Sequence, residues 1–213
     1  MSGILLLCRH GNTFNKGEKV FMVGSRNDME LTKEGREQAE SLGDALNHAN
    51  LIPERIIAGP LKRTVEFAEI IRTKLSSDSK SEQSSARIDN RLRELDYGEW
   101  EGLSDPEIKA RWGEESFKFW QEQGIRPVGV TFSPSADDLE REAREVLEEQ
   151  AGLGGCALLV TSNGRLREFS RVLGHGPKKV RTGHLCILKY EAGDGWKIVQ
   201  WDLGAGELAD VRP

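Results

Sequence analysis

Polar and basic side chains directly follow three short apolar runs of the sequence. In chain order they are Arg9, His10, Arg63, Ser162 and Asn163. Arginine pairs well with phosphate oxygens, and neutral imidazole can attack phosphorus directly. These residue types therefore predict phosphoryl-transfer chemistry, provided that the fold brings them together.

Phosphoryl transfer to His10 also requires a proton for the departing oxygen. Glu94, in the stretch 92–98, is the candidate general acid, because a carboxyl group can donate a proton and later accept one from water. One ring nitrogen of His10 must be held by an acceptor, so that the attacking nitrogen carries the lone pair.

Short apolar runs alternate with helical patterns along the chain. Continuous apolar runs at 4–8, 55–58 and 156–161 predict strands buried on both faces. Two later runs, 184–190 and 196–201, flank Gly193-Asp194-Gly195 and predict a hairpin. Apolar residues at helical spacing predict helices over 32–46, 60–75, 137–151 and 164–173. This order favours an α/β fold, with a mostly parallel sheet covered by helices on both faces and an antiparallel edge.

The predicted sheet explains how distant residues could form one site. Ligands bind beyond the carboxyl ends of the strands in such sheets. Arg63 would lie in the first turn of a helix, where a cation opposes the helix dipole and an anion is favoured. We therefore expect Arg9, His10 and Arg63 to surround a phosphoryl group at this edge.

The 213 residues predict one α/β domain, 1–213, with a small helical cap insertion at roughly 97–135. The insertion holds Trp100, Trp112 and Trp120 among charged residues, and we expect these rings to form its small core. The stretch 76–85 contains no apolar residue and predicts a solvated loop.

Composition excludes several classes of protein. The net charge is -5, from 30 Lys and Arg against 35 Asp and Glu, which argues against a dedicated nucleic-acid binder. No apolar run approaches the ~20 residues of a membrane helix, and the start lacks the pattern of a signal peptide. Cys8, Cys156 and Cys186 are far apart and predict reduced core thiols. We expect a cytoplasmic protein without nucleic-acid or membrane partners.

Four motifs resemble the signatures of the histidine phosphatase superfamily, the phosphoglycerate mutase-like proteins. In the family's order they are L-C-R-H-G-N-T at 7–13, L-T-K-E-G at 31–35, G-P-L-K-R-T at 59–64 and L-R-E-L-D-Y-G-E-W-E-G at 92–102. The resemblance extends over nearly the whole chain. It implies a three-layer α/β/α sandwich.

The resemblance also implies a role for each matching position. His10 would be the nucleophile that accepts the phosphoryl group, Arg9 and Arg63 would clamp its oxygens, and Glu94 would donate and remove the proton. The arginines supply the positive charge, so that neither a metal nor a cofactor is implied. Asn15 lies near the position of a polar phosphate contact in the family, in a loop that is longer than usual.

One motif of the family is altered. The family's second histidine stands in V-S-H-G after the late strand, whereas this chain reads V-T-S-N-G-R-L-R over 160–167, and alignment of L-R places Ser162 at that histidine. Serine can donate one hydrogen bond but brings no positive charge. The loss of such a contact costs ~10²–10³ in rate. Asn163 and His184 are further candidate donors to the pocket.

The short chain and the G-E-W-E-G ending resemble the small-molecule phosphatase branch of the family. The predicted function is metal-independent hydrolysis of a small phosphorylated metabolite through a phosphohistidine. A phospho-ligand-binding or regulatory protein with weakened catalysis, which Ser162 favours, and a phosphomutase on the same site are the alternatives. The bare edge of the C-terminal hairpin could pair in a homodimer.

Overall fold

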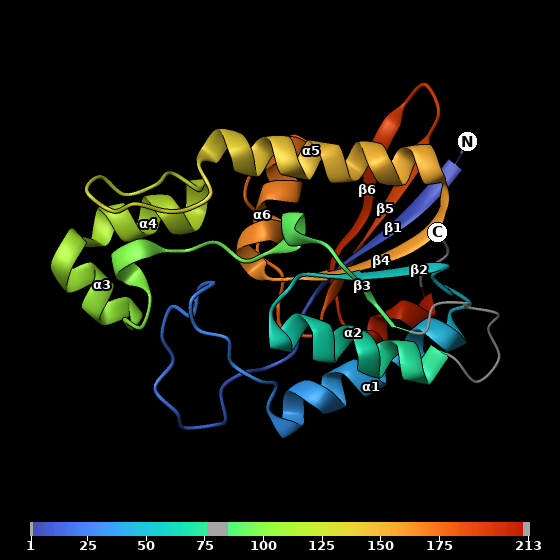
Figure 1. The fold of residues 1–213 in the computed structure, drawn as a ribbon, viewed down its shortest axis with the longest axis horizontal. Helices are drawn as coiled ribbons and strands as arrows, with labels where there is room; N and C mark the ends of the chain where they lie inside the picture. Colours follow the sequence, from blue (N-terminus) through green and yellow to red (C-terminus); the bar gives the residue numbers. More distant parts are fainter. Residues whose placement is uncertain (1, 76–84, 211–213) are drawn as a thin grey trace.

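The computed structural model describes residues 2–75 and 85–210. Its centre is a six-stranded sheet in the order β3-β2-β4-β1-β5-β6 (Figure 1). The strands are β1 (Ser2–Arg9), β2 (Arg55–Ala58), β3 (Arg87–Ile88), β4 (Gly155–Thr161), β5 (Leu185–Glu191) and β6 (Gly195–Leu203). Strands β1 to β4 pair in parallel, while β5 is antiparallel to both β1 and β6. The predicted α/β fold with an antiparallel edge is thereby confirmed. The loop predicted over 76–85 lies, except for Ser85, outside the described residues.

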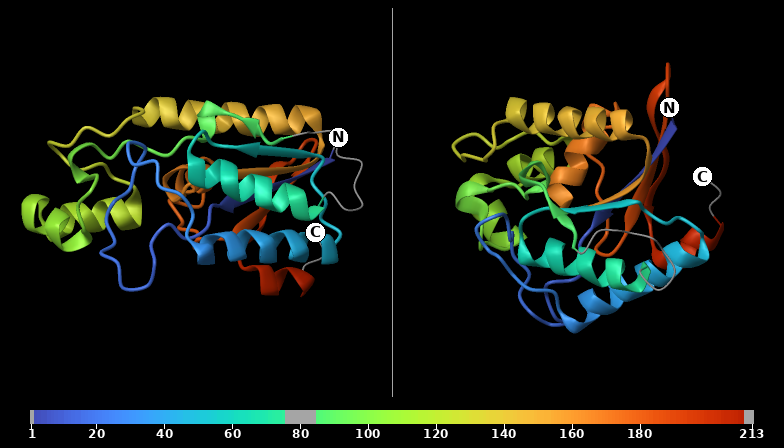
Figure 2. Two further views of the ribbon diagram at one scale, coloured as in Figure 1. Left: turned by 60° about the horizontal axis from the view of Figure 1, so that its bottom comes forward. Right: turned by 45° about the vertical axis from the view of Figure 1, so that its right-hand side comes forward.

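Helices cover both faces of the sheet and one of its ends (Figures 1 and 2). One face carries α1 (Lys33–His48), α2 (Lys62–Leu75) and the 3-10 helix η3 (Ala205–Asp210). The other face carries α5 (Ala136–Leu153) and α6 (Asn163–Val172). The helices α3 (Asp105–Trp112) and α4 (Glu114–Gln123) lie beyond the left end of the sheet in Figure 1. Two short 3-10 helices, η1 (Asn90–Leu92) and η2 (Gly98–Trp100), connect the sheet to α3.

Alternating residues of β1 build two separate cores. Leu6 and Cys8 pack into the cluster under α1 and α2, whereas Leu5 and Leu7 pack into the cluster under α5 and α6. All four side chains are fully buried. Because successive side chains of a strand point to opposite faces, a continuous apolar run is what a strand between two helical layers requires.

A third cluster of buried side chains lies mostly in the segment 97–135, which we call the cap segment, and also includes Leu95 and Leu139. Trp100 and Trp120 are buried there, and both pack edge-on against Phe132, with ring centroids 5.4 and 5.0 Å away. Trp112 packs partly buried against the same cluster. The prediction that the three tryptophans form a small core is confirmed.

The three cysteines are free thiols on strands of the sheet. Cys8 and Cys186 are buried on the neighbouring strands β1 and β5, and Cys156 is partly buried. Burial raises the pKa of Cys156 and of Cys186 to about 12. Within residues 2–75 and 85–210, no helix is both long enough and apolar enough to span a membrane.

Candidate active site

A cavity of about 510 Å³ lies at the carboxyl end of β1. Arg9, His10, Arg63 and Glu94 all line it. Arg9 is the last residue of β1, His10 follows it, Arg63 lies in the first turn of α2, and Glu94 follows η1. The structure thus brings together four residues that are up to 85 positions apart in the chain, from 9 to 94.

The position of Glu94 depends on how closely its segment approaches the ends of β2 and β4. Thr161, the last residue of β4, donates a hydrogen bond from Oγ1 to the carbonyl oxygen of Leu92 at 2.6 Å. A Cβ on Gly59 would lie 2.5 Å from that same carbonyl oxygen. Only glycine therefore lets the segment of Glu94 lie against the end of β2.

The hydrogen bonds of His10 determine which ring nitrogen is free to react. Nδ1 lies 2.8 Å from the carbonyl oxygen of Gly11, which can only accept, so that Nδ1 carries the proton. Arg63 Nε donates to Nε2 at 3.2 Å, which requires a lone pair on Nε2. The neutral tautomer with a nucleophilic Nε2 is therefore the one that the surroundings select.

Burial and neighbouring charge keep His10 neutral. The side chain is buried, and the loss of solvation lowers its pKa well below the ordinary value. The positive charges of Arg63 and Arg9 lower this pKa further. A neutral imidazole can attack phosphorus, whereas an imidazolium cannot.

The two arginines are held by backbone carbonyl groups. Arg63 donates from Nη1 to the carbonyl oxygen of Asn27 at 2.8 Å and from Nη2 to that of Gly24 at 2.9 Å. Arg9 donates from Nη1 to the carbonyl oxygen of Val180 at 2.8 Å. Arg9 Nε is buried and has no partner among the described residues. Burial lowers the pKa of both guanidinium groups, so an anion between them would stabilise their charge.

Glu94 is buried and is held by three donors. The amide of Leu95 and the hydroxyl of Tyr97 donate to Oε1 at 2.8 and 3.3 Å, and the amide of Gly164 donates to Oε2 at 3.5 Å. A Cβ on Gly164 would lie 2.3 Å from Oε1 of Glu94, so glycine is needed for this approach. Gly164 is in the first turn of α6, where the helix dipole favours a carboxylate.

Glu101 holds the strip of chain to which Arg63 is bonded. Its side chain is 3% exposed, and it accepts hydrogen bonds from the amides of Ser25 and Arg26 and from Arg26 Nε at 3.0 to 3.2 Å. It also accepts one from the amide of Tyr97 at 3.1 Å. The strip 24–27 supplies both carbonyl groups that bind Arg63. Sequence reasoning assigned no role to Glu101, although it stands in the 92–102 motif.

Only some of the remaining candidate residues line the cavity of His10. Asn15 and Asn163 line the cavity, and the described lining residues do not include Ser162. Asn15 donates from both its backbone and side-chain nitrogens to the exposed carboxylate of Glu18, at 2.8 Å each. Asn163 Oδ1 accepts from the amide of Val180 at 3.0 Å.

Ser162 and His184 do not enter the cavity. Ser162 is fully buried, and its Oγ has no hydrogen-bond partner in the described part of the chain. His184 Nδ1 lies 3.0 Å from the carbonyl oxygen of Asp202 and 3.3 Å from Asp202 Oδ1. His184 lines a neighbouring cavity beside α1, which shares Glu34 and Thr182 with the cavity of His10. His184 therefore contacts Asp202 of the neighbouring strand β6.

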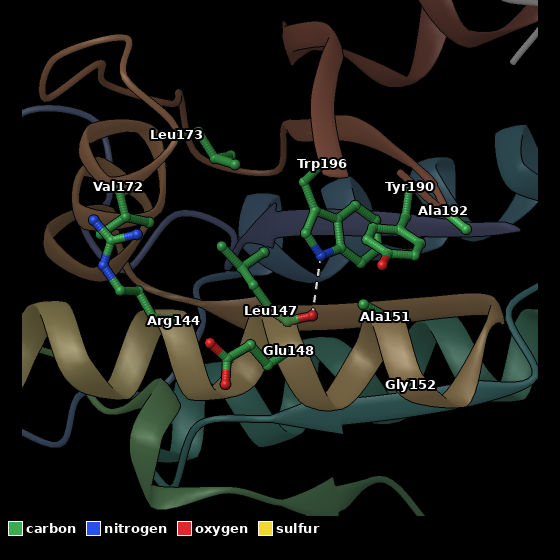
Figure 3. A pocket seen from close by; sticks show the side chains of 10 residues that line it. All are labelled: Arg144, Leu147, Glu148, Ala151, Gly152, Val172, Leu173, Tyr190, Ala192 and Trp196. Atoms are coloured by element: carbon green, nitrogen blue, oxygen red, sulfur yellow. Dashed lines mark hydrogen bonds between the residues drawn. The ribbon is translucent and has the colours of Figure 1, made fainter. Parts of the chain in front are cut away.

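A second cavity, of about 540 Å³, lies away from these residues, between α5, the end of α6 and the β5–β6 hairpin (Figure 3). Its lining is mostly apolar, and Trp196 Nε1 donates to the carbonyl oxygen of Leu147 at 2.9 Å. It contains none of the phosphate-binding candidates. Among residues 2–75 and 85–210, no group of three or more His, Cys, Asp or Glu side chains is placed to hold a metal ion.

Comparison with known proteins identifies the family of the chain. The family described as histidine phosphatase superfamily (branch 1) matches residues 5–203 of the chain. The chain therefore belongs to this superfamily, whose members are typically phosphatases or mutases.

Curated relatives include enzymes described as 2,3-bisphosphoglycerate-dependent phosphoglycerate mutases. That of Mesorhizobium japonicum is 26% identical over 213 residues, covering 97% of this chain and 90% of the mutase. That of Parvibaculum lavamentivorans is 30% identical over 149 residues, covering 69% of this chain and 65% of the mutase. The match to the second mutase thus spans slightly less than two thirds of its length.

Among solved structures, a mycobacterial glucosyl-3-phosphoglycerate phosphatase in complex with VO3 has a similar fold. Its TM-score is 0.75 at 23% sequence identity, and the match covers 95% of this chain and all of that chain. This likeness confirms the three-layer fold.

Proposed function

We propose that this protein hydrolyses a small phosphorylated metabolite, without a metal ion, through a phosphohistidine intermediate on His10. The observation that carries the proposal is the placement of His10 Nε2, which bears a lone pair and lies 3.2 Å from Arg63 Nε in a cavity that Arg9 and Glu94 also line. In this proposal residues 1–213 are one domain, and the cap segment is an insertion beside the site, which lines the cavity only through Tyr97 among the described residues.

In the first step, the lone pair of His10 Nε2 attacks phosphorus and forms a P–N bond, while the P–O bond to the substrate's alcohol breaks. Arg63 exchanges its hydrogen bond with Nε2 for one to a phosphoryl oxygen, and Arg9 Nε gains the acceptor that it lacks. The negative charge of the bound phosphoryl group beside Glu94 favours the protonated form of this residue. Protonated Glu94 gives its proton to the departing oxygen, so that a free alcohol leaves.

In the second step, a water molecule attacks phosphorus as the Glu94 carboxylate takes a proton from it. The P–N bond breaks, and its electron pair returns to His10 Nε2. Inorganic phosphate leaves, and neutral His10 and protonated Glu94 are restored. The net change is ester plus water to alcohol plus phosphate, with no further reactant.

We assign the place of the family's second histidine to Asn163 instead of Ser162. Asn163 lines the cavity, and its Oδ1 is bound by the amide of Val180, which fixes the side-chain amide and leaves Nδ2 to donate to a phosphoryl oxygen. Buried Ser162 stands at the N-cap position of α6, where its side chain makes no capping hydrogen bond among the described residues. This assignment retains a donor but no charge, and thus favours a slower enzyme over a binding protein without catalysis.

A phosphomutase on the same site is the second candidate, because the curated relatives described above are mutases. A mutase would return the phosphoryl group from His10 to a second oxygen of the substrate, whereas a phosphatase returns it to water.

Phosphate release tests the proposal. Wild type and His10→Ala are each incubated in EDTA with a panel of phosphorylated metabolites, after circular dichroism has shown that both are folded. We expect the wild type alone to release phosphate. A positional isomer of the substrate, formed without phosphate release, would favour the mutase. Equal release by both proteins would contradict the proposal.

A further inference from the structure

Five apolar side chains of one loop line the same cavity as His10. They are Phe14, Val20, Phe21, Met22 and Val23. The Phe14 and Phe21 rings pack edge-on with centroids 5.0 Å apart, and Val20 is 62% exposed. Apolar surface left open inside a cavity is typical of a site for an apolar ligand group.

This apolar wall is held in place by the cap segment. Met22 exchanges two backbone hydrogen bonds with it: the Met22 amide donates to the carbonyl oxygen of Leu103 at 2.9 Å, and the Gly102 amide donates to that of Met22 at 2.8 Å. Lys19 Nζ pairs with Glu107 Oε1 at 2.9 Å. The wall therefore exists before a substrate binds, so that binding does not have to order it.

The charges around the apolar wall disfavour a second anionic group on the substrate. Besides Arg9, Arg63 and Glu94 at the phosphate end, the charged residues that line the cavity are Lys16, Glu18 and Glu34. Two carboxylates and one exposed ammonium group cannot clamp an additional carboxylate or phosphate in the way that two buried arginines can.

We infer that this wall binds the alcohol part of the substrate, and that this alcohol is an apolar, ring-sized group without a second anionic group. The cavity of about 510 Å³ has room for a ring beside the phosphoryl group. The inference rests on the proposed function, because it assigns the leaving group of the same reaction.

The test compares kcat/KM for 3-phenylpropyl phosphate with that for glycerol 3-phosphate and for 3-phosphoglycerate. The first two are both esters of primary alcohols, so the chemistry of the leaving group does not favour the aromatic ester. We expect at least about a tenfold preference for the phenylpropyl ester. Replacement of Phe21 by Ala should reduce the ratio between these two esters about tenfold, mainly through KM.

Phe119→Ala is the matched control, since Phe119 is 44% exposed on α4 and does not line this cavity. It should leave the ratio unchanged. A preference for glycerol 3-phosphate or 3-phosphoglycerate, or an unchanged ratio in Phe21→Ala, would overturn the inference and leave the hydrolysis proposal standing.

Calorimetry tests the inference without turnover, by measuring the affinities of His10→Ala for 3-phenylpropyl phosphate and for glycerol 3-phosphate. If the wild type releases phosphate from no compound, the proposed function fails. Tighter binding of the phenylpropyl ester would then still support the apolar wall, and equal or weaker binding would overturn it.

Discussion

Arg63 Nε donates a hydrogen bond to His10 Nε2 across 3.2 Å, so the proposed nucleophile is in contact with a group that we expect to bind the phosphoryl oxygens. The contact joins the end of β1 to the first turn of α2, and it has two effects. It selects the tautomer with a lone pair on Nε2, and it places a positive charge beside the ring, which disfavours protonation.

His10 should therefore remain neutral at pH 6.5, the ordinary pKa of a histidine. Burial first, and then Arg63 and Arg9, lower its pKa, so the free protein should show the ring protonating only well below that pH. In the unfolded chain His10 takes up a proton near pH 6.5, and its contribution to stability is therefore present above this pH and decreases as the pH falls. NMR titration of the ring measures the pKa directly.

Arg63→Gln is the comparison, since it removes one positive neighbour and should raise the pKa of His10. A wild-type titration at the ordinary value, with no change in the variant, would show that the surroundings do not act on His10 as described.

Glu101 is expected to act as a positioning residue. Glu101→Gln keeps the size of the side chain but removes the charge that binds the strip 24–27, and we expect kcat to fall ~10-fold because Arg63 is less well oriented. The pKa of His10 should also shift, which a merely structural role elsewhere would not cause. Glu99→Gln, two residues away and exposed, is the control and should behave as the wild type. Equal effects of the two substitutions would contradict this role.

Asn163 and Ser162 should contribute unequally to catalysis. Asn163→Ala removes a donor that lines the cavity, and we expect a loss of ~10²-fold in kcat/KM. Ser162→Ala should change kcat/KM by less than about threefold, since Ser162 does not line the cavity. Steady-state kinetics of the two variants decide the question. A larger effect of Ser162→Ala would contradict the assignment of Asn163 and would show that Ser162 takes the place of the family's second histidine.

Trp100 should stabilise the cap segment. It is fully buried against Trp112, Phe117 and Phe132. Trp100→Ala should lower the free energy of unfolding by about 3–5 kcal/mol, as large-to-small changes of aromatic core residues do. Urea denaturation measures this change. Val128→Ala, in the same segment at 96% exposure, should have almost no effect, and equal losses would contradict the packing account.

The sheet and the meeting of Arg9, His10 and Arg63 were predictable because these residues come after predicted strands, whereas the place of Glu94, which follows η1, was implied by the resemblance of the 92–102 motif. A continuous apolar run requires burial on both faces, and parallel strands bring their carboxyl ends to one edge. The order of elements therefore determines which residues meet, even though they are far apart in the chain.

The directions of side chains in loops were not predictable in the same way. His184 precedes β5 at the same edge of the sheet, yet its ring is bonded to Asp202 of β6. Glu101 resembles any exposed carboxylate in sequence, and only the approach of the strip 24–27 buries it. Such contacts form between segments that lie far apart in the chain, and no local sequence pattern indicates that these segments pack together.

Trapping of the phosphoryl group shows whether His10 is the nucleophile. The protein is mixed with a phosphorylated substrate in EDTA for a single turnover and quenched in alkali, and the modified peptide is identified by mass spectrometry. We expect a phosphoryl group on His10 in the wild type and in no peptide of His10→Ala, which should also release no phosphate. Continued phosphate release by a folded His10→Ala protein, or a phosphoryl group on another residue, would contradict this role of His10.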